Sequence, residues 1–385
     1  MLPVLLRRII SCCWLGVLPL VARAQAPVRV LFVGNSFTHG QSAPVLTYNS
    51  ANVIDENANL PATSPRYEGG GPSWGGVPGI FKKLCDQAGF NYEVHIEAIS
   101  GQTLRFHYDN ALSVVNGSAW NKVVLQEYST GPVRTVRGGN RSSFYAAATA
   151  LEQAVHQVNA QAQVYLYETW ARADLTYPSG APYAGLPVDS MTADLHNGYY
   201  RQYATNGRTA AVAPAGDAWL RAIATGVATR NPYTPDATKL NLWGLDYYHA
   251  SKWGSYLNAL VLFYTLTGTD PRTLGSAEQA AAALGIAPAA AVSLQQVAYQ
   301  QVSGAALAVR PAQQRRLTIY PNPAPGGVSS VNGAAPHAAI LVRDALGRVR
   351  LATTATEAGT AELVGLPAGL YVVQAGAGVV RLSVE

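Results

Sequence analysis

The sequence predicts a three-layer α/β/α sandwich on a parallel sheet of five strands, followed by a small all-β sandwich. Short apolar runs rich in β-branched residues alternate with amphipathic stretches over most of the chain, which is typical of parallel α/β domains. From residue 315 to residue 385 the helical pattern stops, and short alternating strands follow between Gly-rich turns. The chain has 385 residues, 49% of them hydrophobic, so it can form a large core.

Residues 1–24 are interpreted as a secretory signal peptide. Two Arg residues precede an apolar run over 9–21, and Ala22-Arg23-Ala24 provides an A-x-A cleavage site. The run is shorter than the roughly 20 residues that span a bilayer, so it is not interpreted as a transmembrane helix. We expect no transmembrane segment in the chain after the signal peptide is removed. A lipidated Cys would follow the run, whereas Cys12 and Cys13 lie near its start.

Removal of this segment takes away three Arg and no acidic residue, which leaves 24 basic and 22 acidic residues and a net charge of +2. These charges are scattered, and the basic stripe typical of nucleic-acid-binding proteins is missing. Cys85 would be the one remaining cysteine, which excludes an intrachain disulfide and a Cys-based zinc site. Because Cys85 lies in an apolar helical pattern, we interpret it as a buried hydrophobic residue rather than a nucleophile.

The α/β pattern places the elements in a definite order. The five strands are expected at 28–33, 92–99, 122–127, 163–168 and 209–215. The stretches between them, of which 77–88 and 142–159 are the clearest, are long enough to be crossover helices. A helix at about 251–266 and an Ala-rich helical stretch complete a domain over 25–308, which a linker at 309–314 follows.

The C-terminal module, residues 315–385, carries Tyr320-Pro321-Asn322-Pro323 near its start and Gly369-Leu370-Tyr371-Val372-Val373 near its end. These hallmarks resemble the C-terminal sorting domain of proteins that the type IX secretion system of Bacteroidetes exports. The resemblance implies the type IX secretion machinery as a partner and a secreted or cell-surface location. A generic β-sandwich appendage is the alternative.

The first predicted strand leads into Gly34-Asn35-Ser36-Phe37-Thr38, which places Ser36 at the carboxyl edge of the sheet, where sites of open α/β sheets form. The segment is not a G-x-S-x-G elbow, because Thr38 replaces the last Gly. A Ser after a strand is also commonly a helix cap. Ser36 alone therefore does not predict catalysis.

Asp246 and His249 lie three residues apart just before a predicted helix. A Ser nucleophile needs a base, and the base needs an orienting carboxylate. His249 could take the proton of Ser36, while Asp246 would hold the imidazole in the correct tautomer. The alternative is a helix-capping Asp beside a structural His.

The order of these motifs resembles the SGNH hydrolase superfamily, the GDSL-like esterases and lipases, over about residues 27–270. The Ser36 segment is similar to its first block, with Asn35 in place of the usual Asp, and Ser100-Gly101-Gln102-Thr103-Leu104 is similar to its second. Asp246 to His249 matches its final D-x-x-H. The resemblance implies a flavodoxin-like SGNH fold, the catalytic residues Ser36, His249 and Asp246, and oxyanion donors at the N–H groups of Ser36 and Gly101.

The third block departs from the superfamily, which usually has G-x-N-D where this chain has Val124-Leu125-Gln126-Glu127-Tyr128-Ser129. The segment is similar to the V-L-Q-E-x-S of uncharacterised SGNH-like proteins from the same bacteria. Gln126 is therefore expected to be the third oxyanion donor, because a carboxylate at Glu127 would repel the developing charge. Alternatively, Gln126 ties a neighbouring loop, and Ser129 becomes the candidate.

Trp170 follows the fourth predicted strand, Trp74 lies in the loop over 68–76, and His107 closely follows Gly101. All three are expected substrate contacts, although core packing is an equal alternative for each aromatic residue. His39 and His107 could rival His249 as the base, but neither follows an Asp by three residues. The seven His residues form no H-x-x-x-H pair, which argues against a metal centre, and no cofactor is expected.

Together these features predict a secreted, metal-free serine esterase that forms an acyl-enzyme on Ser36. The expected substrates are acyl esters of carbohydrates or short-chain lipids, and acyl transfer to another alcohol would use the same residues. The alternative is a non-catalytic carbohydrate-binding or surface-attached protein on the same scaffold, because a fold does not determine a function.

Overall fold

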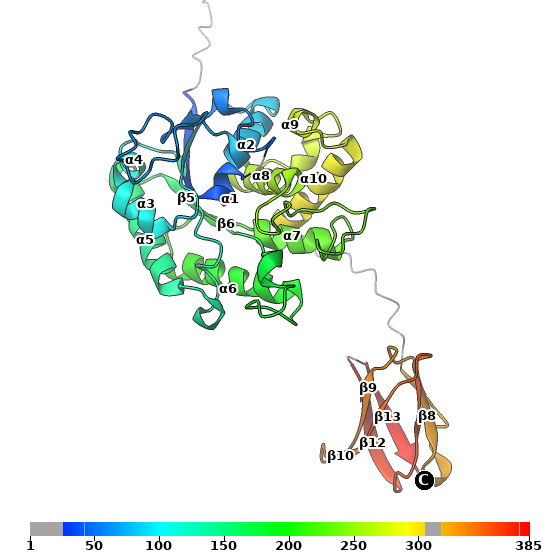
Figure 1. Ribbon diagram of the computed structural model, residues 1–385. Helices are drawn as coiled ribbons and strands as arrows, with labels where there is room; N and C mark the ends of the chain where they lie inside the picture. Colours follow the sequence, from blue (N-terminus) through cyan, green and yellow to red (C-terminus); the bar gives the residue numbers. More distant parts are fainter. Residues whose placement is uncertain (1–25, 42, 305–316, 377) are drawn as a thin grey trace, which may run out of the picture. The chain divides into compact units, whose positions relative to one another are not determined.

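The computed structural model describes residues 26–41, 43–304, 317–376 and 378–385. It divides the chain into two compact units, Met1–Leu307 and Ala308–Glu385 (Figure 1). The predicted signal peptide at 1–24 and the linker at 309–314 lie outside the described residues. Within the described part of the chain, no helix combines the length and the apolar character that a membrane span needs.

Unit 1 is built on a parallel sheet of six strands in the order β2-β3-β1-β4-β5-β6. The five predicted strands are confirmed, and the unpredicted β2 adds two residues beside β3 at the edge of the sheet. The strands are β1 (Val28–Gly34), β2 (Ile54–Asp55), β3 (Tyr92–Ala98), β4 (Lys122–Leu125), β5 (Gln163–Tyr167) and β6 (Ala211–Ala213).

Helices cover both faces of this sheet, as the sequence predicts. They are α1 (Ser36–His39), α2 (Gly76–Gln87), α3 (Leu104–Asn110), α4 (Leu112–Val115), α5 (Arg141–Val158), α6 (Val188–Asn206), α7 (Ala215–Ala224), α8 (Lys252–Thr267), α9 (Gln279–Ala283) and α10 (Pro288–Val302). Short 3-10 helices lie in the connections at Ser50–Asn52, Thr135–Arg137, Ala173–Leu175 and Pro271–Leu274.

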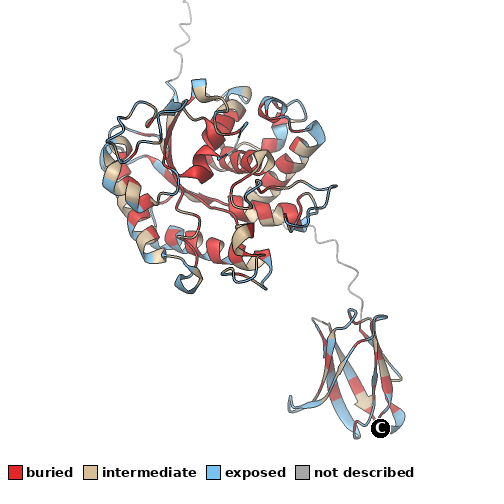
Figure 2. Cartoon of the chain, viewed as in Figure 1, coloured by how far each residue is buried: buried red, intermediate tan, exposed pale blue. Residues whose placement is uncertain are grey.

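The central strand β1 divides the core of unit 1 in two. Val30 and Phe32 pack into one cluster with α2, α7, α8 and α10, whereas Leu31 and Val33 pack into the other with α3, α4 and α5. Successive side chains of a strand point to opposite faces, so one uninterrupted apolar run supplies both layers. The sheet and the inward sides of the helices are accordingly buried (Figure 2).

Unit 2 is an all-β sandwich, as predicted, with antiparallel sheets in the orders β10-β9-β12-β13 and β11-β8-β7. Its own apolar core includes Val331, Ile340 and Leu382. The strands are β7 (Thr318–Tyr320), β8 (Ser329–Asn332), β9 (Ala339–Asp344), β10 (Val349–Thr354), β11 (Thr360–Leu363), β12 (Gly369–Ala375) and β13 (Gly378–Val384), and a short 3-10 helix lies at Pro325–Gly327.

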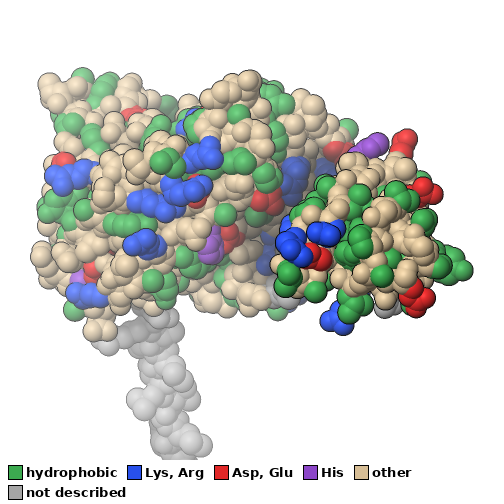
Figure 3. Space-filling model, turned by 90° about the horizontal axis from the view of Figure 1, so that it is seen from below, with side chains coloured by type: hydrophobic (Ala, Val, Ile, Leu, Met, Phe, Trp, Pro, Cys, Tyr) green, Lys and Arg blue, Asp and Glu red, His purple; other side chains and the backbone are tan. Residues whose placement is uncertain are grey.

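The surface charge follows the scattered pattern of the sequence. On the face of the molecule in Figure 3, Lys and Arg side chains lie dispersed among uncharged and acidic ones. This face therefore offers no continuous basic stripe of the kind that binds a nucleic-acid backbone.

Candidate active site

Strand β1 runs directly into the short helix α1, and Ser36 is the first residue of that helix. Asn35 precedes the helix in an extended conformation, and its side-chain oxygen accepts the Phe37 N–H at 3.1 Å. This cap satisfies a backbone donor that the helix itself leaves free. Ser36 is thereby fixed at the carboxyl edge of the sheet, and its residue is only 4% exposed.

The structure brings Ser36, His249 and Asp246 together. His249 Nε2 lies 2.9 Å from Ser36 Oγ, and His249 Nδ1 lies 2.5 Å from Asp246 Oδ2. The other oxygen of Asp246 accepts the N–H groups of Tyr248 at 3.0 Å and His249 at 2.9 Å. Tyr247 has a φ of 59°, and this left-handed conformation turns the chain sharply between the Asp and the His.

These contacts determine the charge and the tautomer of the group. Partial burial tends to raise the pKa of the Asp246 carboxyl, but hydrogen bonds from the His249 ring and from two backbone N–H groups lower the pKa below its ordinary value. The ionised carboxylate accepts the Nδ1–H of His249, so the Nε2 lone pair faces the Ser36 hydroxyl. The arrangement can therefore remove the hydroxyl proton from Ser36.

Trp170, predicted as a substrate contact, is instead a packing residue. Its ring is fully buried between Phe37, with ring centres 3.9 Å apart, and Trp219, with centres 4.7 Å apart. Its indole N–H donates to the Tyr248 carbonyl at 3.2 Å. The stack packs against α1 through Phe37, and the indole hydrogen bond holds the loop that carries His249. Neither face of the Trp170 ring remains open to a ligand.

The same correction applies to His107, which is fully buried on α3. Its Nε2 lies 2.7 Å from the Gly34 carbonyl and therefore donates to it, and its Nδ1 lies 3.3 Å from Glu97 Oε1. His107 holds the end of β1 in place and cannot touch a substrate in this arrangement.

The predicted oxyanion role of Gln126 does not fit the contacts of its fully buried side chain. Its Oε1 accepts the Asn35 N–H at 3.0 Å and the Thr38 hydroxyl at 2.8 Å, while its Nε2 donates to the Glu127 carbonyl. Gly34 has to be small here, because a Cβ would collide with the Gln126 and Thr38 side chains. Gln126 thus ties the turn around Ser36, which is the alternative that the sequence left open.

The neighbours of Gln126 in the third block are also engaged. Glu127 is buried, and its carboxylate accepts the N–H groups of Tyr128 at 2.7 Å and Leu104 at 3.3 Å. Burial raises the pKa of Glu127 to about 7, although these two hydrogen bonds oppose the shift. Ser129 is buried as well, and its hydroxyl accepts a hydrogen bond from Arg172 at 3.1 Å.

The two predicted backbone donors are differently placed. Neither the Ser36 N–H nor the Gly101 N–H donates to another group within the described part of the chain. Gly101 has a φ of 71° in the exposed loop after β3. The Asn35 side chain holds this loop next to α1, because its Nδ2 donates to the Gln102 carbonyl at 2.8 Å.

Two groups beside the triad carry no sequence motif of their own. The Tyr248 ring lies 4.1 Å from the His249 ring, and the Arg172 guanidinium lies 3.6 Å above the Tyr248 ring. Asp174 accepts two hydrogen bonds from Arg172, which keeps this guanidinium in place. Only their positions in the sequence could have pointed to these two residues. Tyr248 directly precedes His249, and Arg172 lies two residues after Trp170 in the loop that follows β5.

His39 lies at the end of α1 and hydrogen-bonds to Ser100, not to a carboxylate. Its Nδ1 donates to the Gly40 carbonyl at 2.7 Å, and its Nε2 lies 3.0 Å from Ser100 Oγ. The pKa of His39 is lowered to about 4, mainly by burial; the hydrogen bond to the Gly40 carbonyl opposes this shift, and a positive charge on His249 adds a smaller contribution to it. His39 is therefore neutral at pH 7, with its proton on Nδ1.

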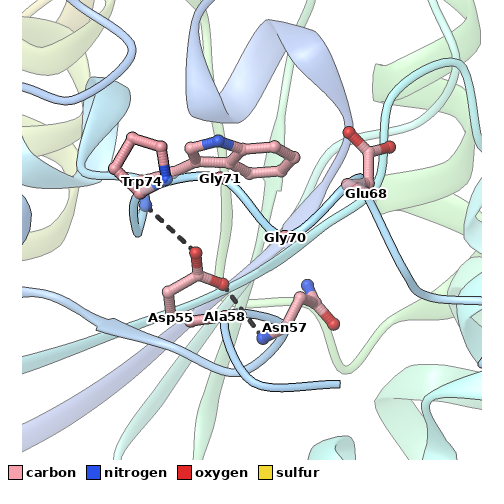
Figure 4. Close-up of a pocket in the computed structure, with 8 residues that line it drawn as sticks. Asp55, Asn57, Ala58, Glu68, Gly70, Gly71 and Trp74 are labelled. Carbon is pink, nitrogen blue, oxygen red and sulfur yellow. Dashed lines mark hydrogen bonds between the residues drawn. The ribbon is translucent and has the colours of Figure 1, made fainter. Parts of the chain in front are cut away.

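Trp74 borders a small polar pocket (Figure 4). The Trp74 ring centre lies 4.0 Å from that of His39, and the Trp74 N–H donates to Asp55 at 3.0 Å. The amide nitrogen of Asn57 in the pocket has no hydrogen-bond partner among the described residues. The lining residues are Asp55, Asn57, Ala58, Glu68, Gly70, Gly71, Pro72 and Trp74.

Comparisons with known proteins give fold resemblances only. No family model and no curated protein matches the chain. A DUF4886 family protein from Bacteroides uniformis is 15% identical, with 72% of this chain and 95% of the other covered and a TM-score of 0.44. A protein described as a GDSL-like lipase from Parabacteroides merdae is 14% identical, with 64% of this chain and 98% of the other covered and a TM-score of 0.43.

A variant of the acetyl xylan esterase from Geobacillus stearothermophilus is 12% identical to this chain, with 62% of this chain and 94% of the other covered and a TM-score of 0.39. The similar structures are thus GDSL-like hydrolases and carbohydrate esterases. We base the roles of individual residues on the geometry of this chain alone.

Proposed function

We propose that this protein is an exported serine ester hydrolase with Ser36 as the nucleophile, His249 as the base and Asp246 as its orienting carboxylate. One observation carries the proposal: residues 213 positions apart in the sequence form an uninterrupted hydrogen-bond chain from Asp246 through His249 to Ser36. A helix cap or a structural His would not require a Ser hydroxyl at the free ring nitrogen.

The reaction follows from these contacts. Ser36 Oγ attacks the ester carbonyl carbon while its proton passes to His249 Nε2, and Asp246 stabilises the resulting imidazolium. The N–H groups of Ser36 and Gly101 are free to donate to the oxyanion. The alcohol leaves with the proton from Nε2, and water then attacks the acyl-Ser36 ester with His249 again as the base. The acid departs and the Ser36 hydroxyl is restored.

The polar pocket beside Trp74 supports an acylated carbohydrate as the substrate. A volume of about 20 Å³ accommodates one hydroxyl group. Glu68 can accept a hydrogen bond from that hydroxyl, and the Trp74 indole offers an apolar face to a sugar ring. We expect Trp74→Ala to raise KM for an acetylated oligosaccharide while KM for p-nitrophenyl acetate stays unchanged.

Short-chain lipid esters are the second substrate class, and a larger groove favours them. It has a volume of about 440 Å³, borders Asp246 and is lined partly by Trp243, Leu245 and Trp253. Comparable kcat/KM values for tributyrin and for acetylated oligosaccharides would favour this class.

Export is part of the proposal, with residues 1–24 as the signal and residues 315–385 as the type IX sorting module. In a bacterium with that secretion system, the full chain should reach the cell surface or the medium. A chain that ends at residue 308 should remain in the periplasm, and its appearance outside the cell would contradict the sorting role.

Hydrolysis of an aryl ester by single and double variants tests the chemistry. Ser36→Ala and His249→Ala should each lower kcat to near background, and the double variant should be no slower, because the two residues act as a unit. Asp246→Asn should lose roughly 10⁴ in turnover through the wrong tautomer. The exposed Ser142→Ala on α5 is the matched control and should keep full activity. Full activity of a folded Ser36→Ala protein would exclude this mechanism.

A further inference from the structure

A second group of ionisable side chains lies at the carboxyl end of β5. Glu168 directly follows that strand, His196 lies on α6, and Asp217 lies in the first turn of α7. One ligand atom from each of the three lies within 4.8 Å of those from the other two. His196 Nδ1 is 2.8 Å from Asp217 Oδ2 and 3.9 Å from Glu168 Oε1.

One oxygen of this group has no partner. Glu168 is fully buried, and its Oε2 accepts the Asp217 N–H at 3.0 Å. Its Oε1 has no hydrogen-bond partner among the described residues, although it faces His196. Buried polar atoms are almost always satisfied, and an unsatisfied one is costly, so this oxygen indicates a missing ligand.

We propose that Glu168, His196 and Asp217 bind one divalent transition-metal ion, with Zn²⁺ as the best fit. Zn²⁺ lies about 2.0 to 2.2 Å from each oxygen or nitrogen ligand, so two ligand atoms of one ion cannot be more than roughly 4.4 Å apart. The two separations that involve His196, 2.8 Å and 3.9 Å, lie within this limit, and the oxygens of Glu168 and Asp217 lie within 4.8 Å of each other. A His nitrogen with two carboxylate oxygens suits Zn²⁺, whereas Ca²⁺ and Mg²⁺ take oxygen ligands.

Solvent reaches the group from the His196 side, because the His196 side chain is 42% exposed and that of Asp217 is 18% exposed. On binding, the Nδ1 proton of His196 and any proton on the buried Glu168 carboxyl are released to solvent, and the freed lone pairs bind the metal. The Tyr200 ring, stacked 4.1 Å from the His196 ring, keeps the imidazole in this orientation.

The ion stabilises unit 1 and takes no part in the chemistry of Ser36. It joins the end of β5 to α6 and α7, which lie next to each other (Figure 1). Strand β4 separates β5 from β1, so the end of β5 lies roughly 10 Å from β1, the strand that leads into Ser36. No metal motif is visible in the sequence, because the three ligands lie 21 to 49 residues apart in the chain.

The test uses the mature chain after dialysis against EDTA. Titration with Zn²⁺ should show one ion bound per chain, and at 100 times Kd the melting temperature should rise by about 5 °C. Co²⁺ should give visible absorption bands of a low-coordinate nitrogen–oxygen site. Ca²⁺ and Mg²⁺ should have no effect, and kcat for an aryl ester should be the same with and without Zn²⁺.

Glu168→Gln keeps the shape of the buried side chain but removes a ligand, so it should weaken Zn²⁺ binding at least tenfold without lowering the melting temperature of the metal-free protein. His196→Gln, which changes a half-exposed side chain, is the second variant and should also weaken Zn²⁺ binding at least tenfold without lowering the melting temperature of the metal-free protein. His337→Asn in unit 2 is the matched control, because it removes an exposed His at a φ of 57° that Asn tolerates. Absence of Zn²⁺ binding in the wild type, or binding to both variants that is as tight as binding to the wild type, would overturn the proposal.

Discussion

Gln126→Leu separates the tying role of this side chain from the oxyanion role that the sequence predicted. The Asn35 N–H and the Thr38 hydroxyl both donate to Gln126 Oε1, and both residues are at least 98% buried. Leu fills a similar volume but accepts neither hydrogen bond. Each buried donor left unsatisfied costs about 1 to 3 kcal/mol, so the free energy of unfolding should fall by about 2 to 6 kcal/mol.

Gln126→Glu is the matched control. A protonated Glu accepts the same two hydrogen bonds and donates to the Glu127 carbonyl, so the protein should be nearly as stable as the wild type at pH 5. At pH 8 the ionised form would face that carbonyl without a proton. Because burial raises the folded pKa of such a carboxyl, its contribution to stability is lost as pH rises.

Urea unfolding followed by Trp fluorescence measures these differences, and aryl ester hydrolysis measures kcat on the same samples. The tying role predicts a large loss of stability in Gln126→Leu. An unchanged free energy of unfolding together with a kcat lowered 10² to 10³-fold would refute this reasoning, because that pattern is typical of a lost oxyanion donor.

Three further predictions address other parts of the chain. Cys85 is fully buried and burial raises the pKa of its thiol, so a thiol reagent should leave the folded mature protein unmodified and active; rapid labelling before unfolding would contradict this. Burial raises the pKa of Glu127 in the folded protein to about 7, so the folded carboxyl keeps a proton that the unfolded chain releases. The free energy of unfolding of the wild type, compared with that of Glu127→Gln, should therefore fall by up to about 3 kcal/mol from pH 5 to pH 8. Equal stability differences at both pH values would exclude this shift. A chain that ends at residue 308 should fold and keep its kcat, because unit 1 and unit 2 have separate apolar cores; a tenfold loss of kcat would place unit 2 in the site.

The strand ends and the residues at them could be predicted because both depend on local patterns. The apolar run of β1 ends at Gly34, two residues before Ser36. Asp246 and His249 lie three residues apart before α8, whose first turn is capped by Ser251. The edge strand β2 could not be predicted, since two residues show no alternation.

The directions of single side chains could not be predicted either. Trp170 follows the end of β5, and His107 lies on the helix after β3. Their rings turn into the core because Phe37 and the Gly34 carbonyl provide partners there. Gln126 turns toward the Ser36 loop for the same reason, since the buried Asn35 N–H needs an acceptor. Such partners come from distant parts of the sequence, and local patterns do not contain them.

Covalent labelling with a fluorophosphonate tests the central claim most directly. The mature wild-type protein should gain one adduct, peptide mass analysis should place it on Ser36, and His249→Ala should react far more slowly because no base takes the Ser36 proton. The exposed Ser142→Ala should label as fast as the wild type. A folded wild-type protein that stays unlabelled, or carries the adduct on another residue, would contradict an activated Ser36.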